Sequence, residues 1–254
     1  MERVARGLAP ILACLVALVA CGGRAERTAF PPGDREADYA AVDLAAIPPP
    51  PAAPEPGSLV AEAVVPSIRI FRHQGDDRPW TALRGPGPFE APRVFLVQEE
   101  RDDWLRVLLP MEPNGSEGWI RAREVRLSEN PFSLEVDLED RQLAAFRGDR
   151  VLLRAPVAVG TPATPTPTGL FFTTMLAKPD DPTGPYGPFA YGLSAYSEVL
   201  ETFAGGDGQV AIHGTNNPSL IGDAVSHGCI RVQNSVIRRV ARLIPLGTPV
   251  RITS

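Results

Sequence analysis

The chain has 254 residues, of which 44% are hydrophobic, and a formal net charge of -5. This length suits one large or two small domains, and the apolar fraction is sufficient for a packed core. The negative balance and the lack of a long basic run argue against nucleic acid as a partner. Proline and glycine are abundant, with 28 and 23 residues, and the prolines are clustered.

Residues 1–20 have the pattern of a secretory signal peptide. Arg3 and Arg6 precede an apolar run over residues 8–20, as in the basic and apolar regions of such peptides. A retained membrane anchor is the alternative, but the run contains Pro10 and is shorter than the roughly 18–20 apolar residues that a span requires. The sequence therefore predicts that the protein is exported.

The end of this run resembles the lipobox of bacterial lipoproteins, in which a cysteine is lipidated and becomes the first residue of the mature chain. The matching residues are Leu18-Val19-Ala20-Cys21. The resemblance implies lipidation of Cys21 and attachment to the outer face of a bacterial membrane through that lipid, with simple secretion as the alternative. The expected location is the cell envelope, where peptidoglycan is the local polymer.

Residues 21–57 form a predicted tether. The segment after Arg24 is rich in proline and alanine, includes Pro48-Pro49-Pro50-Pro51 and has almost no helical or alternating apolar pattern. Such a chain is disordered or adopts a polyproline helix, which rises about 3.1 Å per residue. We expect this segment to carry the folded part well away from its anchor, unless it serves only solubility.

Residues 58–128 are predicted to form a domain of short β-strands. The expected strands cover residues 67–71, 93–99, 104–109 and 118–120, with Asn114-Gly115 at the apex of a hairpin. The run that starts at Trp104 and closes with Gly118-Trp119-Ile120 resembles bacterial Src-homology-3-like β-barrels, which often accompany cell-wall enzymes. The resemblance implies a small β-barrel in front of the second domain.

Residues 130–254 are predicted to form a second, mainly β domain. Strands are expected over residues 133–138, 142–147, 151–159, 170–175 and 209–212, and one helix over residues 235–244. The proline-dense residues 160–169 cannot join a strand ladder and predict a rigid loop, and residues 186–191 also predict a loop. The pattern favours a two-sheet sandwich or open barrel, with a helix after Cys229, over a doubly wound fold.

The segment from residue 213 to residue 231 concentrates the reactive residues of the chain. It holds two of the three histidines and one of the three cysteines. Cys14 and Cys21 lie in the N-terminal segment, so Cys229 cannot form a disulfide within the folded part. A lone thiol in an exported protein suggests reactivity. Because Cys229 shortly precedes the predicted helix, backbone N–H groups and the helix dipole are expected to favour its thiolate.

A histidine beside this thiol would complete an activated nucleophile. His213 ends a predicted strand, and the loop that follows is long enough to bring its imidazole to the sulfur of Cys229. His227 lies two residues before Cys229 and would share its face in a strand, so His227 is the alternative base. A zinc site built from these three residues is a further alternative, but no fourth ligand is evident and no metal is expected.

Other residues of the segment have predicted supporting roles. Gly228 lets the backbone approach a scissile carbonyl, so the N–H groups of Gly228 and Cys229 are candidate oxyanion donors. Arg231 could bind a substrate carboxylate through two hydrogen bonds, and Ser226 is expected to order the turn. Three asparagines are candidates for hydrogen bonds to substrate, with loop or helix-cap roles as the alternative: Asn216, Asn217 and Asn234.

Three motifs in the second domain resemble the catalytic domain of the L,D-transpeptidases (the YkuD family) of bacterial cell walls. They are Thr166-Pro167-Thr168-Gly169, Ile212-His213-Gly214 and Ser226-His227-Gly228-Cys229-Ile230-Arg231, and the similarity covers residues 131–253. The resemblance implies that Cys229 is the nucleophile and His213 the base, while the backbone carbonyl of Gly214 fixes the tautomer of His213. His227 is then a supporting residue of the pocket, and no cofactor is needed.

The same resemblance implies a substrate and a reaction. Cys229 would attack a donor stem peptide of peptidoglycan to form a thioester, and an amine of an acceptor stem peptide would then form the cross-link. Carbapenem-type β-lactams are expected to acylate Cys229. The alternatives are an L,D-carboxypeptidase or another cysteine-dependent wall peptidase, and a non-catalytic wall-binding lipoprotein in which the Src-homology-3-like domain acts.

Overall fold

The structure is a computed structural model that describes residues 57–202 and 206–254. The predicted signal peptide, the lipidation of Cys21 and the tether up to residue 56 lie outside the described residues. Within the described ranges, no helix has the length and apolar character needed to cross a membrane.

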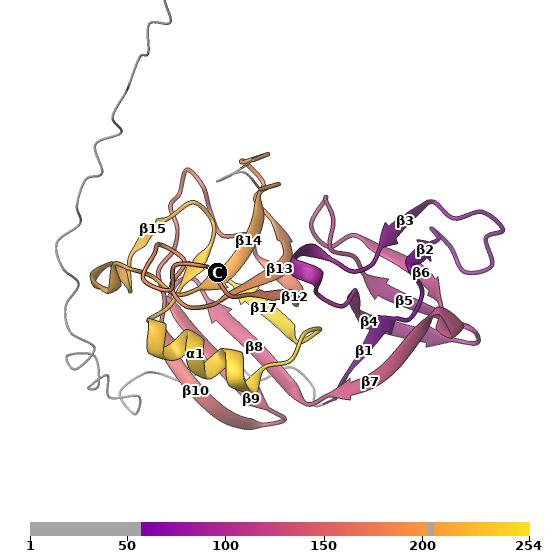
Figure 1. The fold of residues 1–254 in the computed structure, drawn as a ribbon, viewed down its shortest axis with the longest axis horizontal. Helices are drawn as coiled ribbons and strands as arrows, with labels where there is room; N and C mark the ends of the chain where they lie inside the picture. The colour runs from indigo at the N-terminus through magenta and orange to yellow at the C-terminus, as the bar shows by residue number, and fades with distance from the viewer. Residues whose placement is uncertain (1–56, 203–205) are drawn as a thin grey trace, which may run out of the picture. The chain divides into compact units, whose positions relative to one another are not determined.

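The first part of the described chain is built from a five-stranded antiparallel sheet, with strand order β6-β5-β4-β1-β7 (Figure 1). Strands β2 and β3 form a separate hairpin. The strands predicted over residues 67–71, 93–99, 104–109 and 118–120 are confirmed as β2, β4, β5 and β6. The bounds are β1 (Ser58–Ala63), β2 (Ser67–Ile70), β3 (Thr81–Arg84), β4 (Val94–Arg101), β5 (Trp104–Leu108), β6 (Glu117–Arg121) and β7 (Val125–Asn130), with short 3-10 helices η2 (Pro88–Glu90) and η3 (Ala122–Glu124).

The predicted hairpin between β5 and β6 is present, because antiparallel pairing joins Trp104 to Arg121 and Leu108 to Glu117. This register centres the connection on Glu112-Pro113, and Asn114-Gly115 instead form the middle of a turn that the hydrogen bond from the Ser116 N–H to the Pro113 carbonyl closes at 3.1 Å. Gly115 has a φ of 78°, a conformation that glycine adopts without steric cost. The resemblance of this region to a Src-homology-3-like barrel stays a prediction.

The second part is a single eight-stranded sheet, with strand order β10-β9-β8-β17-β12-β13-β14-β16, and a short parallel pair of strands, β11 and β15 (Figure 1). The mainly β prediction is confirmed. The bounds are β8 (Phe132–Asp137), β9 (Gln142–Arg147), β10 (Arg150–Pro156), β11 (Val159–Gly160), β12 (Gly169–Ala177), β13 (Ala190–Tyr196), β14 (Gln209–His213), η4 (Pro218–Leu220), β15 (Ala224–Ser226), β16 (Ile230–Arg231), α1 (Asn234–Leu243) and β17 (Pro249–Thr253).

One hydrophobic core serves both halves of this sheet. Leu134 of β8, Leu193 of β13 and Ile212 of β14 are fully buried in the same cluster. The sheet therefore curls, so that its two halves form the two layers around the core. Helix α1 contributes Ile237 and Val240 to this cluster, because these apolar positions recur at helical spacing on one face.

Two local predictions for this part need correction. The expected loop over residues 186–191 ends at Phe189, because Ala190 and Tyr191 pair with Ala177 and Leu176 as the first residues of β13. The long strand expected over residues 151–159 is divided into β10 and β11. Both errors have the same cause, since glycine and proline mark irregular backbone well but do not show where a ladder resumes.

The two parts are joined closely. Strand β7 runs to Asn130 and only Pro131 separates it from β8, so the predicted boundary at residues 128–130 falls inside a strand. Val60 and Leu96 of the first sheet share a small buried cluster with Phe172 of β12. These apolar contacts fix the first sheet against the second one.

A polar contact adds to this junction. The Asn114 side chain donates to the Tyr196 carbonyl and accepts from the Tyr196 N–H, both at 2.8 Å. Asn114 therefore takes the place that a neighbouring strand would have at the end of β13.

Candidate active site

Strands β14 and β16 lie side by side in parallel, and their register defines a common outer face. Ile212 is opposite Ile230, and both side chains are fully buried in the core. Because side chains alternate across a strand, the next pair, His213 and Arg231, points away from that core. The imidazole and the guanidinium are therefore direct neighbours on the outer face.

Cys229 joins this face through the same register. It directly precedes β16, and a hydrogen bond from the backbone of Ala211 reaches its thiol, which places it opposite Ala211. Ala211 and His213 are two residues apart in β14 and share a face. Cys229 and His213 are thus diagonal neighbours on this face.

His213 is 3% exposed and is held by two groups. Its Nδ1 lies 2.6 Å from the carbonyl oxygen of Gly214, so Nδ1 carries the proton and donates it. The ring of Tyr186 packs on the imidazole with a centroid distance of 4.9 Å and an interplanar angle of 55°. This arrangement leaves Nε2 as the nitrogen with a free lone pair, the atom that can accept a proton.

Burial sets the charge state of the pair. Desolvation lowers the pKa of His213 to about 4, against a smaller raising effect of the Gly214 hydrogen bond and a lowering effect of the Arg231 charge. Desolvation raises the pKa of the half-buried Cys229 thiol, although the Ala211 hydrogen bond and Arg231 both oppose the change. At neutral pH the resting pair is therefore a neutral thiol and a neutral imidazole.

The predicted preference of Cys229 for the thiolate form is wrong, because desolvation raises the pKa of the thiol. Cys229 also does not directly precede the helix in the chain, since β16 comes before α1, which begins at Asn234. The side chain of Arg231 acts on the thiol by its positive charge.

Ser226 orders the turn before Cys229, as predicted. Its hydroxyl donates to the carbonyl of Cys229 at 2.5 Å and accepts from the N–H of Gly228 at 3.1 Å. Because that N–H is already bonded, the prediction of Gly228 as an oxyanion donor is not supported, and of the two candidates the N–H of Cys229 remains. Gly228 is required for a different reason, its φ of 111°, which L-residues rarely adopt.

His227 and Arg231 differ from the predictions in different ways. The expected strand alternation between His227 and Cys229 is absent, because residues 227 and 228 form a bend. His227 is exposed while Cys229 is half-buried. The Nε of Arg231 is buried and, within the described part of the chain, has no hydrogen-bond partner.

Asn234 has a structural contact rather than an open position. Its side-chain oxygen accepts from the N–H of Thr215 at 2.9 Å. A Cβ added to Gly187 or to Gly214 would lie 2.3 Å from that oxygen, so both glycines are needed for the close approach. Among the three asparagines, Asn217 is also bonded locally, since its side-chain oxygen accepts from the hydroxyl of Ser219.

The proline-rich loop over residues 160–169 is hydrogen-bonded to the turn that precedes Cys229. The N–H of Thr161 and the hydroxyl of Thr164 both donate to the carbonyl of Ser226, at 3.0 and 3.1 Å. Gly160 pairs with Ser226 in the short β11–β15 ladder. The rigid loop expected over residues 160–169 is thus tied to the segment that carries Cys229.

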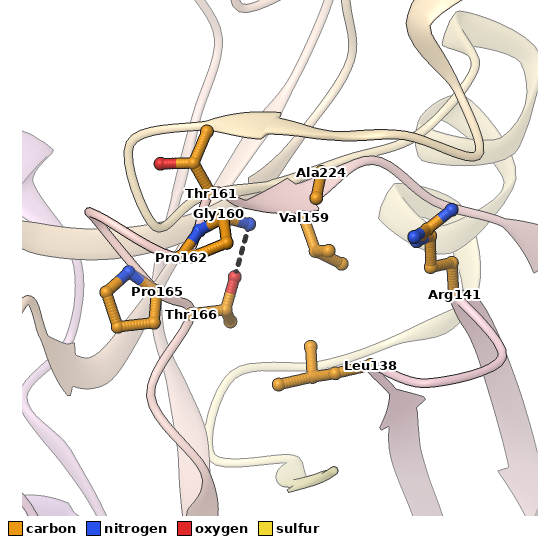
Figure 2. A pocket seen from close by; sticks show the side chains of 9 residues that line it. All are labelled: Leu138, Arg141, Val159, Gly160, Thr161, Pro162, Pro165, Thr166 and Ala224. Atoms are coloured by element: carbon orange, nitrogen blue, oxygen red, sulfur yellow. Dashed lines mark hydrogen bonds between the residues drawn. The ribbon is translucent and has the colours of Figure 1, made fainter.

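A cavity of about 210 Å³ opens beside this loop (Figure 2). Figure 2 shows the hydrogen bond from the Gly160 N–H to the Thr166 hydroxyl at its edge. None of the lining residues is a candidate catalytic residue, so this cavity is not the place of the chemistry. Its lining consists of Leu138, Arg141, Val159, Gly160, Thr161, Pro162, Pro165, Thr166 and Ala224.

Tyr186 is a residue of the site that the sequence patterns do not reveal. The tyrosine lies in the loop before β13, 27 residues before His213, and nothing in the local pattern distinguishes it from the other aromatic residues of that loop. Only the fold brings its ring onto the imidazole. Desolvation raises its pKa, and the nearby charge of Cys229 adds to this shift, so Tyr186 is close to both reactive groups.

A metal centre finds no support in the described ranges. No group of three or more His, Cys, Asp and Glu side chains there could hold an ion. The zinc alternative, which required His213, His227 and Cys229 together, therefore lacks the geometry for it.

Comparison with known proteins identifies relatives of the second part. The family model of the L,D-transpeptidase catalytic domain, YkuD, matches residues 131–252. YkuD of Bacillus licheniformis is 40% identical over 123 residues, covering 48% of this chain and 66% of the relative. YqjB of Bacillus subtilis is 32% identical over 142 residues, covering 50% of this chain and 76% of the relative. Both relatives are named as L,D-transpeptidases whose activity has not been established.

A solved structure, the catalytic domain of the L,D-transpeptidase from E. faecium, is also similar. It is 27% identical, covers 48% of this chain and 95% of that chain, and superposes with a TM-score of 0.35. The chain spans 66% of the length of the first relatives it matches.

Proposed function

Because this chain belongs to the family of the YkuD-type L,D-transpeptidase catalytic domain, we propose that it is a peptidoglycan L,D-transpeptidase that works through a thioester on Cys229. The observation that carries the proposal is the common face of β14 and β16. It holds a thiol and an imidazole as diagonal neighbours, and the Gly214 carbonyl occupies Nδ1. Such a pair is the usual activation of a cysteine nucleophile.

In the first half of the proposed reaction, Cys229 Sγ attacks the carbonyl carbon of an L-centre in a donor stem peptide. His213 Nε2 takes the thiol proton during the attack, so that neither group has to be charged beforehand. The N–H of Cys229 is the candidate donor to the oxyanion that forms. When the C–N bond breaks, the imidazolium returns the proton to the departing amine of the terminal D-amino acid, and a thioester remains.

In the second half, the amine of an acceptor stem peptide attacks the thioester carbonyl and gives a proton to His213. The C–S bond then breaks, the sulfur recovers the proton, and a new amide joins the two stems. Arg231, whose Nε has no partner among the described residues, is proposed to bind a carboxylate of the substrate.

The proposal extends to the location of the enzyme. Lipidation at Cys21 and export would hold the catalytic domain in the cell envelope, within reach of peptidoglycan. Carbapenem-type β-lactams are proposed inhibitors, because an activated acyl group placed at the thiol would form a stable adduct with Cys229.

Mass spectrometry of the full chain after incubation with a carbapenem tests the nucleophile. Peptide mapping should locate one adduct, on Cys229. Cys229→Ala should remove the adduct completely, and His213→Gln should slow its formation by a factor of about 100 or more. An adduct that persists in Cys229→Ala would overturn the assignment.

Product analysis with a purified donor stem peptide tests the reaction itself. With an acceptor amine present, a cross-linked dimer is expected along with the released D-amino acid. Release of the D-amino acid with water as the only acceptor would instead identify an L,D-carboxypeptidase. A chain that binds wall fragments but turns over no stem peptide would be the wall-binding lipoprotein.

A further inference from the structure

The peptide unit between Gly214 and Thr215 is the link between the catalytic histidine and helix α1. Its carbonyl oxygen lies 2.6 Å from Nδ1 of His213. Its N–H, which belongs formally to Thr215, donates to the side-chain oxygen of Asn234 at 2.9 Å. One peptide plane is therefore bonded at both ends, to the imidazole and to the first residue of α1.

The planarity of the peptide bond makes these two contacts dependent on each other. In a trans peptide the C=O and N–H groups point in opposite directions and cannot turn separately. A side chain that fixes the N–H direction thereby fixes the C=O direction. Hydrogen bonds in such a chain also polarise one another, so the Asn234 contact strengthens the carbonyl as an acceptor for the His213 proton.

The surroundings show that this contact is tightly built. Gly187 and Gly214 both lie so close to the Asn234 oxygen that an added Cβ would approach it to 2.3 Å. Gly187 follows Tyr186, whose ring packs on the imidazole. Asn234 therefore fits between the two backbone segments that carry the groups in contact with His213.

We propose that Asn234 is a positioning residue that selects the tautomer of His213 through the Gly214–Thr215 peptide. It touches neither the thiol nor the substrate in this role. With Asn234 in place, the carbonyl of Gly214 holds the proton on Nδ1 and leaves Nε2 as the base. Without it, the peptide plane is free to turn, Nε2–H becomes populated, and the imidazole can no longer accept the proton of Cys229.

The proposal rests on the proposed function only for its effect on rate, and the tautomer itself can be observed directly. The chain has three histidines, so nitrogen NMR of histidine-labelled full-length protein can be assigned with variants of His73 and His227. At neutral pH the wild type should show His213 protonated on Nδ1 and not on Nε2. Asn234→Ala should give a mixture of the two tautomers.

Acylation by a carbapenem supplies the second measurement. Asn234→Ala should slow the formation of the Cys229 adduct by about 10- to 100-fold. Asn234→Asp keeps an oxygen of the same reach, so it should retain the tautomer and form the adduct at a rate within about threefold of wild type. Ser235→Ala is the matched control, because Ser235 is exposed in the same turn of α1. Asn234→Ser, too short to reach the Thr215 N–H, replaces Asn234→Ala if that variant does not fold.

The outcomes separate the two proposals. An Asn234→Ala or Asn234→Ser protein with the Nδ1–H tautomer and wild-type acylation would overturn the positioning role while leaving the proposed function intact. A wild-type protein that no carbapenem acylates would contradict the proposed function, and the tautomer measurement would still decide the role of Asn234.

Discussion

The charge state of the Cys229–His213 pair predicts two different pH profiles for one thiol. An alkylating agent such as iodoacetamide reacts with whatever thiolate is present at equilibrium. A carbapenem is instead attacked while His213 removes the proton, so its reaction needs only a neutral imidazole. Changing the pH and comparing the two reagents therefore separates a neutral resting pair from an ion pair formed in advance.

The magnitude follows from the two pKa values. The pKa of His213 is about 4 and that of the thiol is raised above 9.0, so moving the proton between them costs roughly 7 kcal/mol. Even two unit charges as close as about 4 Å attract each other by only about 4 kcal/mol at an effective dielectric constant of about 20. The remaining cost of about 3 kcal/mol leaves the ion pair at roughly 1% of molecules or less.

The assay is peptide mapping of Cys229 after timed reaction with each reagent. Alkylation should accelerate by about tenfold per pH unit between about pH 6 and pH 9. Carbapenem acylation should change little over the same range and should fall as the pH approaches 4, where His213 becomes protonated. An alkylation rate that is already at a plateau near pH 6 would show a stable thiolate–imidazolium pair and refute this account.

Three further predictions concern stability and the catalytic turn. Glu135 is 3% exposed, its carboxylate oxygens have no partner in the described part of the chain, and burial raises its pKa to about 7. Because the ionised carboxylate destabilises the fold above this pKa, Glu135→Gln should increase the free energy of unfolding by about 1–2 kcal/mol near pH 8 and change it little near pH 4.5. Urea titrations measure both values, with the exposed Glu100→Gln as the control. Asn114→Ala should lower the free energy of unfolding by about 1–3 kcal/mol, because it removes two hydrogen bonds to the backbone of Tyr196; an unchanged denaturation midpoint would mean that this junction contributes nothing. Ser226→Ala removes the hydrogen bonds of the hydroxyl to Cys229 and Gly228 and should slow carbapenem acylation by about tenfold or more. The thermal midpoint should shift too little to explain this loss of rate. Acylation at the wild-type rate would show that the turn keeps its shape without the hydroxyl.

Sequence patterns alone determined the elements with strong local signals. Alternation identified the strands that became β8 and β9, and Asn114-Gly115 identified the hairpin between β5 and β6. The histidine at the end of a strand, His213 in β14, was correct as well, because motif, period and turn chemistry are properties of consecutive residues.

Only the tertiary structure decided what surrounds the reactive pair. Burial lowers the pKa of His213 and raises that of Cys229, and burial depends on segments far away in the chain. The ring of Tyr186 reaches the imidazole from another loop. The role of Asn234 is of the same kind, since a hydrogen bond to Thr215 across 19 residues leaves no trace in local periodicity.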